Sequence, residues 1–377
     1  MPSSYWLEEP GPELVGRPLD GPPDVEVVGA GITGCSAALT LAEAGLRVRV
    51  HEARRVAEGA SGRNGGFALR GGAMSYSHAR EWLGDDVARD YWIATERGLD
   101  RLAETVGDAL HRVGSLRVAA DQEEHEELRA EYEALREDGF QAEWREPLPP
   151  PLDRSFPAAI FHPPDAAVQP ARMTRRVALR AAEAGAEFVE NHRVEALAEL
   201  EADRVLVATD GYPSGLLGDF EALVVPTRGQ MIATEPIPER LFDCPHYGRH
   251  GFDYWQQLDD GRITAGGFRD VDMTSEFTAE EVITPTIQTA LEDFLARIVG
   301  RRLEVTHRWA GIFGLVLDFL PVVGPAPAQP GTWVCGGYSG HGNVLGFMCG
   351  DLVAKTMLGE EQPLLALFDP ERLLAAA

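Results

Sequence analysis

Residues 24–52 alternate apolar and polar positions in three successive patterns, and each pattern predicts a different element. The run "DVEVVG" has the length and the apolar character of a buried strand that ends at a glycine. Cys35, Leu39 and Ala42 then recur at helical spacing until Gly45, which is typical of a helix end. Because "LRVRVHE" predicts a second strand, the whole stretch predicts a strand–helix–strand unit.

The remaining pattern predicts further helices and two kinds of sheet. From Trp82 to Glu137 the pattern is helical and charged, and "QEEHEELRAEYEALRED" places Leu128, Tyr132 and Leu135 on one stripe of a surface helix. The other predicted elements are a helix from about Ala171 to Ala184, short strands in "EFVENHRVEAL" and "DRVLVATDGY", an antiparallel sheet between Val224 and Gly267, a helix near Thr286 to Val299, and a final strand, glycine-rich turn and helix in "WVCGGYSGHGNVLGFMCGDLVAKTMLG".

This order predicts an α/β fold, α+β overall, in which two domains interleave along the chain. We expect a discontinuous Rossmann-like nucleotide-binding domain from residues 1–84, 155–215 and 318–377. A second domain with an antiparallel sheet would take residues 85–154 and 216–317 and bind the substrate. The proline-rich "EPLPPPLDRSFP" is the expected crossing between them.

The charge and cysteine content of the chain limit which kinds of partner and cofactor it can bind. The chain has 34 Lys and Arg against 60 Asp and Glu, a net charge of -26 that would repel nucleic acid. The same charge favours the approach of a cationic small molecule, or it serves solubility alone. The four cysteines show no C-x-x-C or metal-binding spacing, so we expect reduced thiols in a cytoplasmic protein without a metal site. We also expect no signal peptide and no membrane span.

Glycines stand where the chain would approach a nucleotide. The turn between the first strand and helix carries three, of which the first permits a tight turn, the second a close approach to pyrophosphate and the third helix packing. The acid that ends the second strand would accept a hydrogen bond from a ribose hydroxyl. Further glycines follow in "EGASGRNGGFALRGG", and small residues end the strand in "DRVLVATDGY". The turn residues are Gly29, Gly31 and Gly34, the acid is Glu52, and the small residues include Ala208 and Thr209.

Seven motifs in this chain resemble, in order, those of the glycine oxidase and D-amino acid oxidase family of FAD enzymes. They are the dinucleotide turn with its acid, "GASGRNGG", "VATDGY", "PTRGQM", "DGRITAGGF", "DFLPVVG" and "GYSGHG". The opening "SYWLEE" and the loop "GASGRNGG" are most similar to the gamma-glutamylputrescine oxidase branch. The resemblance spans essentially the whole chain and implies FAD as the cofactor.

The resemblance also assigns the residues that would hold FAD. The ADP half would lie on the dinucleotide turn and Glu52, flanked by Ala53 and Arg54, with Val194 near the adenine. The start of the last helix would face the flavin, where free N–H groups stabilise the negative charge of the reduced ring, and His341 could add to that effect or be structural. The ring system would contact Ser61, Gly62, Arg63, Asn64, Gly65 and Gly66 from one segment and Gly337, Tyr338, Gly340, His341, Gly342 and Asn343 from the other.

The chain departs from the family at the substrate position. Amino acid oxidases of this family usually carry an arginine shortly after "WAG" that pairs with the substrate carboxylate, and here Phe313 stands in its place. This predicts an amine with a neutral or distant carboxylate, such as gamma-glutamylputrescine or a related N-substituted amine. If an amino acid is the substrate instead, Arg228 or Arg308 would have to turn inward.

Two further departures bear on flavin chemistry. Gly311 and Arg63 occupy the positions where relatives attach flavin through cysteine or histidine, so we expect noncovalent FAD. The lysine with which sarcosine oxidases activate oxygen would fall near Thr264, and the only lysine of the chain is Lys355 in the last helix. Oxygen is therefore an expected acceptor that another acceptor could replace.

The implied reaction is hydride transfer from the carbon beside nitrogen to the flavin, which gives an imine that water hydrolyses to an aldehyde. The protein would bind the neutral amine, align its C–H bond and exclude water. Candidate pocket walls are Tyr254, Trp255, Trp309, Phe313 and Tyr338, with Gln230 and Asn64 as polar contacts, although core packing is an equal alternative for each aromatic.

Two rival functions remain open at this stage. One is an FAD dehydrogenase that passes electrons to another acceptor, and the other is a flavin-binding protein without turnover.

The first predicted strand contains a charged residue, Glu26, although such a strand should be apolar on both faces. Parallel pairing would bring Arg49 beside it, so we predict an ion pair between them, with Arg47 as the less favoured partner and solvent exposure as the alternative.

Overall fold

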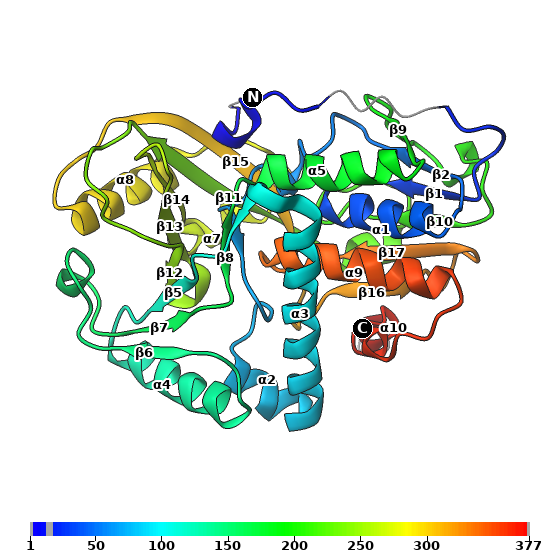
Figure 1. Ribbon diagram of the computed structural model, residues 1–377. Coiled ribbons are helices and arrows are strands. Elements are labelled where there is room, and N and C mark those ends of the chain that lie inside the picture. The colour runs from blue at the N-terminus through cyan, green and yellow to red at the C-terminus, as the bar shows by residue number, and fades with distance from the viewer. Residues whose placement is uncertain (1–2, 13–17, 375–377) are drawn as a thin grey trace.

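The structure is a computed structural model that describes residues 3–12 and 18–374. The described strands form sheets of six, eight and three strands. Figure 1 shows the six-stranded sheet with its helices at one end of the molecule and the eight-stranded sheet at the other, with the long helix α3 (Asp85–Val106) running beside the junction. The cavity described below lies where the two large sheets meet.

The six-stranded sheet is the parallel sheet that the sequence predicts. Its strands pair in parallel except at one edge, where β16 runs antiparallel to β17. The order across the sheet is β16 (Val322–Pro325), β17 (Thr332–Gly336), β10 (Val205–Val207), β1 (Val25–Val28), β2 (Val48–His51) and β9 (Glu187–Val189).

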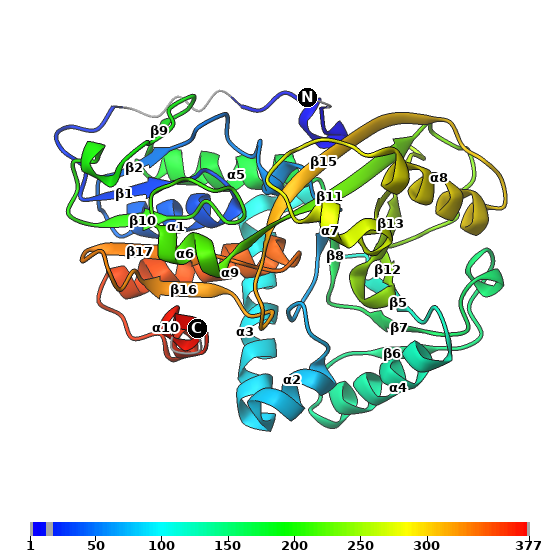
Figure 2. The same ribbon diagram turned by 180° about the vertical axis from the view of Figure 1, so that it is seen from behind.

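Helices bury both faces of this sheet. On one face lie α1 (Ile32–Glu43), α5 (Pro170–Glu183) and α9 (Gly342–Met357), which pack against one another (Figure 1). The short helix α6 (Gly218–Leu223) covers the other face, as Figure 2 shows from behind. Leu206 contacts the first layer while Val205 and Val207 contact the second, so the strand is apolar on both sides.

The eight-stranded sheet is antiparallel except for the pairing of β5 with β12. Its outer face packs on α8 (Pro285–Val299) in a separate apolar core, and its other face looks toward the six-stranded sheet. The order is β15 (Val305–Leu315), β11 (Val225–Thr234), β14 (Ile263–Gly267), β13 (Asp253–Gln257), β12 (His246–Gly248), β5 (Ser115–Val118), β7 (Ala159–His162) and β6 (Glu143–Arg145).

The other elements connect the two large sheets or cover their edges. The third sheet joins β3 (Phe67–Ala68), β8 (Ala166–Val168) and β4 (Leu110–His111). The remaining helices are α2 (Tyr76–Leu83), α4 (Gln122–Glu137), α7 (Met273–Glu276) and α10 (Glu371–Leu374), and the short 3-10 turns are η1 (Tyr5–Leu7), η2 (Ala60–Gly62), η3 (Gly107–Ala109), η4 (Leu152–Arg154), η5 (Leu197–Glu199), η6 (Arg249–Gly251), η7 (Arg269–Asp272) and η8 (Pro363–Leu367).

One predicted region is wrong in part. The segment from Trp82 to Glu137 is not helical throughout, because β4 and β5 separate α3 from α4. The apolar residues of "GSLRV" are few, and only pairing with β7 and β12 makes that stretch a strand. In α4 the stripe is less apolar than expected, since Glu124 and Glu131 are buried beside Leu128 and Leu135.

The predicted domain boundaries stay predictions, and two elements pack against the domain to which they were not assigned. All strands of the six-stranded sheet come from segments assigned to the nucleotide-binding domain. Strand β7 comes from residues 155–215, yet it pairs with β5 and β6 in the other sheet. Helix α3, assigned to the substrate domain, packs on α9 and α5.

The buried carboxylate of β1 has more partners than the sequence predicts. Glu26 is paired in register with Arg49, and their nearest side-chain atoms, Oε1 and Nη1, lie 3.8 Å apart, so the predicted ion pair is confirmed. However, Arg49 bonds Glu187 more closely, at 2.6 Å, and Arg47 pairs with an aspartate at 2.7 Å. The shorter contacts of Glu26 are His51 Nε2 at 3.0 Å and two backbone N–H groups of the loop before β10.

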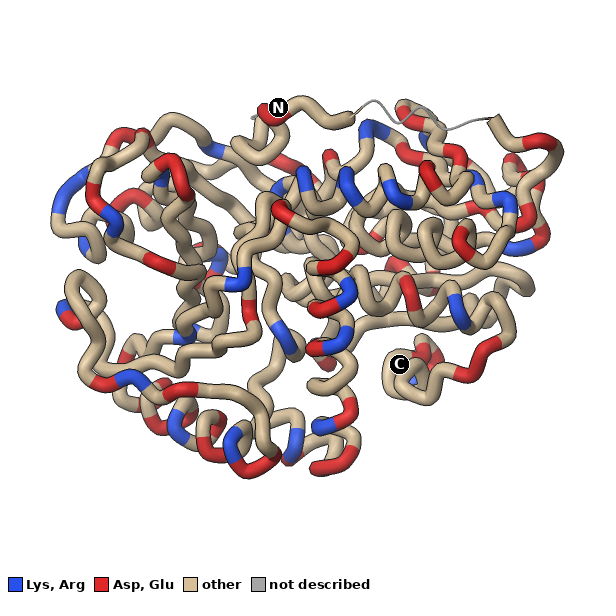
Figure 3. Tube along the Cα trace, in the orientation of Figure 1, with Lys and Arg blue, Asp and Glu red and all other residues tan. Residues whose placement is uncertain are grey.

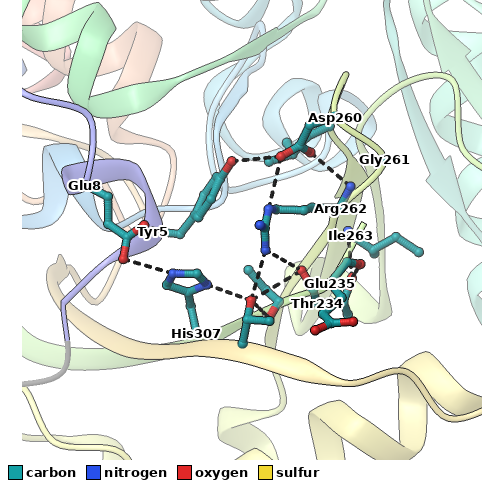
Figure 4. A network of polar contacts seen from close by, with 12 residues as sticks. Tyr5, Glu8, Thr234, Glu235, Asp260, Gly261, Arg262, Ile263 and His307 are labelled. Atoms are coloured by element: carbon teal, nitrogen blue, oxygen red, sulfur yellow. Dashed lines mark hydrogen bonds and ion pairs between the residues drawn. The ribbon is translucent and has the colours of Figure 1, made fainter. Parts of the chain in front are cut away.

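The N-terminal segment crosses the edge of the eight-stranded sheet. Figure 4 shows the Tyr5 hydroxyl donating to Asp260 at 3.2 Å and the Glu8 carboxylate 3.0 Å from the His307 ring. Arg262 joins this network through Asp260 at 3.0 Å. This attachment brings the turn η1 against the glycine-rich loop at residues 59–66.

Acidic residues lie on elements at both ends of the molecule, interspersed with arginines, rather than in one patch (Figure 3). Among the described helices, none has both the length and the apolar character that crossing a membrane requires.

Candidate active site

A large cavity lies between the carboxyl ends of the parallel strands and the inner face of the eight-stranded sheet. One wall comes from the ends of β1, β2 and β10, and the other from β11, β13, β14 and β15. Parallel sheets bind ligands at this edge because the strand ends leave room there and the following helices begin there. Both α1 and α9 start at the cavity.

The turn between β1 and α1 has the geometry that its glycines predict. Gly29 has φ of 106°, which favours glycine, and its N–H donates to the His51 carbonyl at 2.8 Å. A Cβ on Gly31 would stand 3.0 Å from the Ser61 hydroxyl, and one on Gly34 would stand 1.9 Å from the Gly29 carbonyl oxygen. Gly29 and Gly31 line the cavity, while Gly34 lets the helix pack on the strand.

Glu52 holds the end of β2 against this turn. Its carboxylate accepts from the N–H of Ala30 and from the N–H of Arg54, both at 2.8 Å. Burial raises the pKa of Glu52 despite these bonds. Of the residues predicted to hold the ADP half, all except Gly34 line the cavity, and the small residues that end β10 line it too: Gly29, Gly31, Glu52, Ala53, Arg54 and Val194, with Ala208 and Thr209.

The glycine-rich loop and the start of α9 are joined by two asparagines. The Asn64 amide donates to Asn343 Oδ1 at 3.0 Å, and the Asn343 amide donates back to Asn64 Oδ1 at 3.1 Å and to the Phe67 carbonyl at 2.7 Å. Both residues line the cavity, but their amides are largely used in holding the two segments together. The predicted ring-binding residues that line the cavity are Ser61, Arg63, Asn64, Gly65, Tyr338, Gly340, His341, Gly342 and Asn343.

Three of the glycines predicted to contact the ring system do not line the cavity. A Cβ on Gly62 would stand 2.1 Å from the Ala57 carbonyl oxygen, and one on Gly66 would stand 2.6 Å from Val168 O. Gly337, with φ of 77°, turns beneath the loop. These glycines shape the cavity from outside, where the backbone packs too closely for any side chain.

Asp210 is a site residue that the sequence analysis did not single out. It has φ of 49°, lines the cavity, and accepts hydrogen bonds from the N–H of Gly337 at 2.8 Å and of Gly314 at 3.0 Å. Burial raises the pKa of Asp210. It therefore ties the turn before α9 to strand β15, so that nucleotide wall and substrate wall keep a common position.

Glu281 is a second residue missed from the sequence. Its buried carboxylate accepts from Arg54 at 2.9 Å and from the Tyr212 hydroxyl at 2.6 Å, and lies 3.7 Å from Arg63. It stands in the loop between α7 and α8, far along the chain from both arginines. Only the folded chain brings this acid to them, and an isolated glutamate carries no motif that could have revealed it.

The wall that the eight-stranded sheet contributes to the cavity is aromatic. Tyr254 on β13 and Phe313 on β15 line it, and the Tyr254 and Phe67 rings meet edge to face at 6.0 Å. Gly266 makes space for this tyrosine, since a Cβ there would stand 2.3 Å from its ring. Burial raises the pKa of Tyr254 to about 12, so its hydroxyl is neutral at ordinary pH.

Three predicted pocket residues are not among those that line the cavity, and the two tryptophans fit the alternative of core packing. Trp255 follows Tyr254 in the strand and therefore points to the opposite face, where it stacks on His246 at 5.1 Å. Gln230 likewise lies behind the cavity, and its amide donates to Glu276 and to a threonine. Trp309 is fully buried and donates its indole N–H to a backbone carbonyl of the glycine-rich loop.

His341 lies at the cavity, and its environment decides between the two roles that the sequence left open for it. Burial, with the charges of nearby arginines, lowers the pKa of His341 to about 4, which favours a neutral ring and so the structural alternative. Its Nδ1 and the Thr209 hydroxyl are buried at the cavity without a hydrogen-bond partner among the described residues. Unpartnered polar atoms beside two helix N-termini suit a ligand rich in phosphate and polar ring atoms.

A sequence profile described as DAO, FAD dependent oxidoreductase, matches residues 24–356. The chain belongs to this family. FAD is therefore its cofactor, and the cavity fits that group, with the α1 N-terminus and Glu52 placed for the ADP half and the α9 N-terminus for the flavin ring.

Two related proteins and one crystal structure are consistent with membership of this family. The chain is 27% identical to gamma-glutamylputrescine oxidoreductase from Escherichia coli, over 90% of this chain and 84% of that protein. It is 28% identical to glycine oxidase from Pseudomonas aeruginosa, over 89% of this chain and 95% of that protein. The crystal structure of glycine oxidase from Geobacillus kaustophilus shares the fold, with a TM-score of 0.76 at 22% identity over 92% of this chain and 98% of that one.

Proposed function

We propose that the protein oxidises the C–N bond of an amine, of the gamma-glutamylputrescine kind or another N-substituted amine, to an imine that water hydrolyses to an aldehyde. The observation that carries this proposal is Phe313, which lines the cavity. By the family resemblance, oxidases that act on amino acids usually carry an arginine at this place in the sequence. The similarity to gamma-glutamylputrescine oxidoreductase supports the same substrate class. FAD, when bound, accepts the hydride from the carbon beside nitrogen.

The chain's own side chains would bind and orient the amine rather than exchange protons with it. The two carboxylates lining the cavity near the cofactor segments, Glu52 and Asp210, already accept hydrogen bonds from backbone N–H groups. Tyr254 and Phe313 present apolar ring surface at the substrate end, which favours the neutral amine over the ammonium ion and excludes water. The amine would therefore lose its proton to solvent before oxidation.

Molecular oxygen is the proposed electron acceptor, and noncovalent binding the proposed state of FAD. Gly311 and Arg63 offer no nucleophile, and the Arg63 side chain is occupied by carbonyl groups at 2.8 and 3.2 Å. Acid precipitation should therefore release the flavin into solution. Lys355 lies on α9 paired with Asp351 at 2.9 Å, so oxygen activation would have to proceed without a lysine.

An anaerobic flavin-reduction assay tests the proposed activity. We expect gamma-glutamylputrescine to bleach the flavin of the purified holoenzyme, and glycine and D-alanine to do so at least tenfold more slowly at equal concentration. Admitting air should restore the flavin absorbance and yield one peroxide per aldehyde. Faster bleaching by the amino acids would overturn the substrate class. Slow reoxidation by air with fast reoxidation by a quinone would identify a dehydrogenase, and absence of bleaching by all of them would contradict the proposal.

A further inference from the structure

Four arginines line the cavity, and three of them have a carboxylate partner. Arg54 and Arg63 share Glu281, at 2.9 and 3.7 Å. Arg193 lies 3.4 Å from a glutamate two residues further on. Arg269 forms no ion pair and no side-chain hydrogen bond with any residue that the structure describes, although it belongs to the aromatic wall of the cavity.

The backbone places Arg269 at the cavity through a sharp turn. Strand β14 ends at Gly267 with φ of 118°, Phe268 has φ of 61°, and η7 begins at Arg269. The guanidinium carbon lies 4.2 Å from the centre of the Phe252 ring and 5.6 Å from that of Phe313. The aromatic rings hold the guanidinium in place without using its N–H donors.

The charge of Arg269 is not balanced by its neighbours. The adjacent carboxylate, Asp270, is bonded to Arg249 at 2.7 Å. Burial lowers the pKa of Arg269, but an arginine stays charged at any ordinary pH. A partly desolvated cation without a counterion is unfavourable, and contact with aromatic rings offsets only part of that cost. An anionic group of a bound ligand would supply the missing partner, and the five N–H donors suit a carboxylate bound through both oxygens.

The other candidate arginines are not available for this role. Arg228 is buried and forms a two-pronged pair with Glu276, at 2.8 and 2.9 Å. Arg308 bonds Glu292 at 2.7 Å. Neither lines the cavity, so the inward turn considered from the sequence would break an existing ion pair in each case.

We propose that Arg269 binds a carboxylate of the substrate, so that the preferred substrate is an amine carrying an anionic group rather than a plain diamine. That the bound molecule is a substrate rests on the proposed function. Tyr254 lines the same wall: its hydroxyl and the Phe313 ring both lie beside Gly229, and the Arg269 guanidinium lies 5.6 Å from the centre of that ring.

Equilibrium binding separates this inference from catalysis. Benzoate and its neutral analogue benzamide would be titrated calorimetrically into the FAD-loaded protein. We expect the wild type to bind benzoate at least about tenfold more tightly than benzamide, because a hydrogen-bonded charge pair contributes about that much. Arg269→Gln should abolish the preference while benzamide affinity changes less than about twofold. Arg269→Lys should keep part of it, because the charge remains but the two-pronged geometry is lost.

Arg297→Gln is the matched control. Arg297 also packs over aromatic rings, 5.3 Å from the centre of Phe294, and has no ion pair among the described residues, but it lies outside the cavity. This variant should leave both affinities unchanged. Equal benzoate affinity in wild type and Arg269→Gln, or an equal loss of benzoate and benzamide binding, would overturn the inference. If Arg269→Gln does not retain flavin, the same comparison between wild type and Arg269→Lys decides it.

A matched pair of amines links the inference to turnover. Gamma-glutamylputrescine and the same molecule with its carboxylate converted to the carboxamide would be compared by anaerobic flavin reduction. We expect the carboxylate to lower the half-saturating concentration about tenfold in the wild type and to have no effect in Arg269→Gln. Benzoate binding that depends on Arg269 while no amine reduces the flavin would refute the proposed function and leave the anion site standing. Equal saturation by both amines in the wild type would refute Arg269 as a substrate-binding residue.

Discussion

Glu26 illustrates, at the scale of one residue, how a buried charge is kept in a parallel sheet. Its carboxylate is about 1% exposed and accepts from the N–H groups of Glu201 and Ala202 at 2.6 and 2.8 Å. These two bonds use backbone N–H groups, so they remain when a neighbouring side chain such as that of Arg49 is replaced. The arginine at 3.8 Å therefore contributes less to this site than the loop that the carboxylate holds.

A double-mutant cycle on Glu26 and Arg49 measures that difference. We expect Glu26→Val to cost about 2–4 kcal/mol of unfolding free energy, because two buried N–H groups lose their acceptor. Arg49→Val should cost about 1 kcal/mol or less, and the double variant should be no more stable than Glu26→Val. Urea unfolding of the holoenzyme provides the measurement.

Glu26→Gln serves as the reference for this cycle. Glutamine keeps one oxygen for the loop N–H groups while removing the negative charge, so it should recover most of the stability lost in Glu26→Val. If the double valine variant recovered the stability instead, the ion pair with Arg49 would be the interaction that matters.

At the scale of elements, the N-terminal turn η1 supports the glycine-rich loop. Ser4 donates its hydroxyl hydrogen to the Gly62 carbonyl at 2.9 Å, and the buried Trp6 indole donates to the Asn64 carbonyl at 2.8 Å. The loop has few side chains of its own to fix its backbone. The contacts in Figure 4 anchor η1 to the eight-stranded sheet, so the position of the loop depends on a segment 58 residues earlier in the chain.

Trp6→Phe should therefore weaken FAD binding. The phenyl ring keeps most of the packing but cannot donate to Asn64, and loss of about 1 kcal/mol corresponds to an increase of about fivefold in the dissociation constant of FAD. Fluorescence titration of the flavin-free protein with FAD measures it. Trp82→Phe is the control, because Trp82 is 51% exposed and distant from the loop. Equal FAD affinity in Trp6→Phe and the wild type would contradict this role of η1.

At the scale of the whole molecule, several histidines are buried in a neutral form. Burial lowers the pKa of His246 to about 3 and that of His341 to about 4, and it also lowers the pKa values of His51 and His162. In the unfolded chain these rings would take up a proton near pH 6.5. Acid therefore favours the unfolded chain. Asp165, Glu52 and Asp210 act in the opposite direction, because burial raises the pKa of each, that of Asp165 to about 6.

The stability of the holoenzyme should accordingly fall as the pH decreases from 6.5 to 4. In that window the unfolded state binds more protons than the folded state, and His246 and His341 each contribute a slope of up to about 1.4 kcal/mol per pH unit. Asp165, which is protonated more readily in the folded state, would offset one such slope between pH 6 and 3.8. Urea unfolding with saturating FAD at steps of half a pH unit would record this dependence.

His246→Phe isolates one of these contributions. The phenyl ring can keep the stacking on Trp255 but does not titrate, so the slope between pH 6 and 4.5 should decrease by about 1.4 kcal/mol per pH unit. His78→Phe, at an exposed position, should leave the slope unchanged. An unchanged slope in His246→Phe would show that this ring is protonated in the folded protein.

Local sequence determined the cofactor half of the site. The glycines of the first turn and Glu52 act through backbone conformations and contacts that lie within thirty residues of one another. Such constraints leave a readable spacing, because only glycine tolerates the φ of Gly29 or the closeness of Gly34 to a carbonyl oxygen. The parallel register of β1 and β2 followed from the same short stretch.

The tertiary structure decided which side chains face the substrate. Tyr254 and Trp255 are adjacent aromatics in one strand, and only the packing of α8 on one face of the sheet tells which of them lines the cavity. Glu281 reaches the cofactor segments, and Arg269 reaches the cavity without a carboxylate partner among the described residues, through turns whose direction depends on contacts distant in the chain. Sequence spacing predicts what neighbouring residues do together, whereas the pairing or isolation of a charge is set by everything that packs around it.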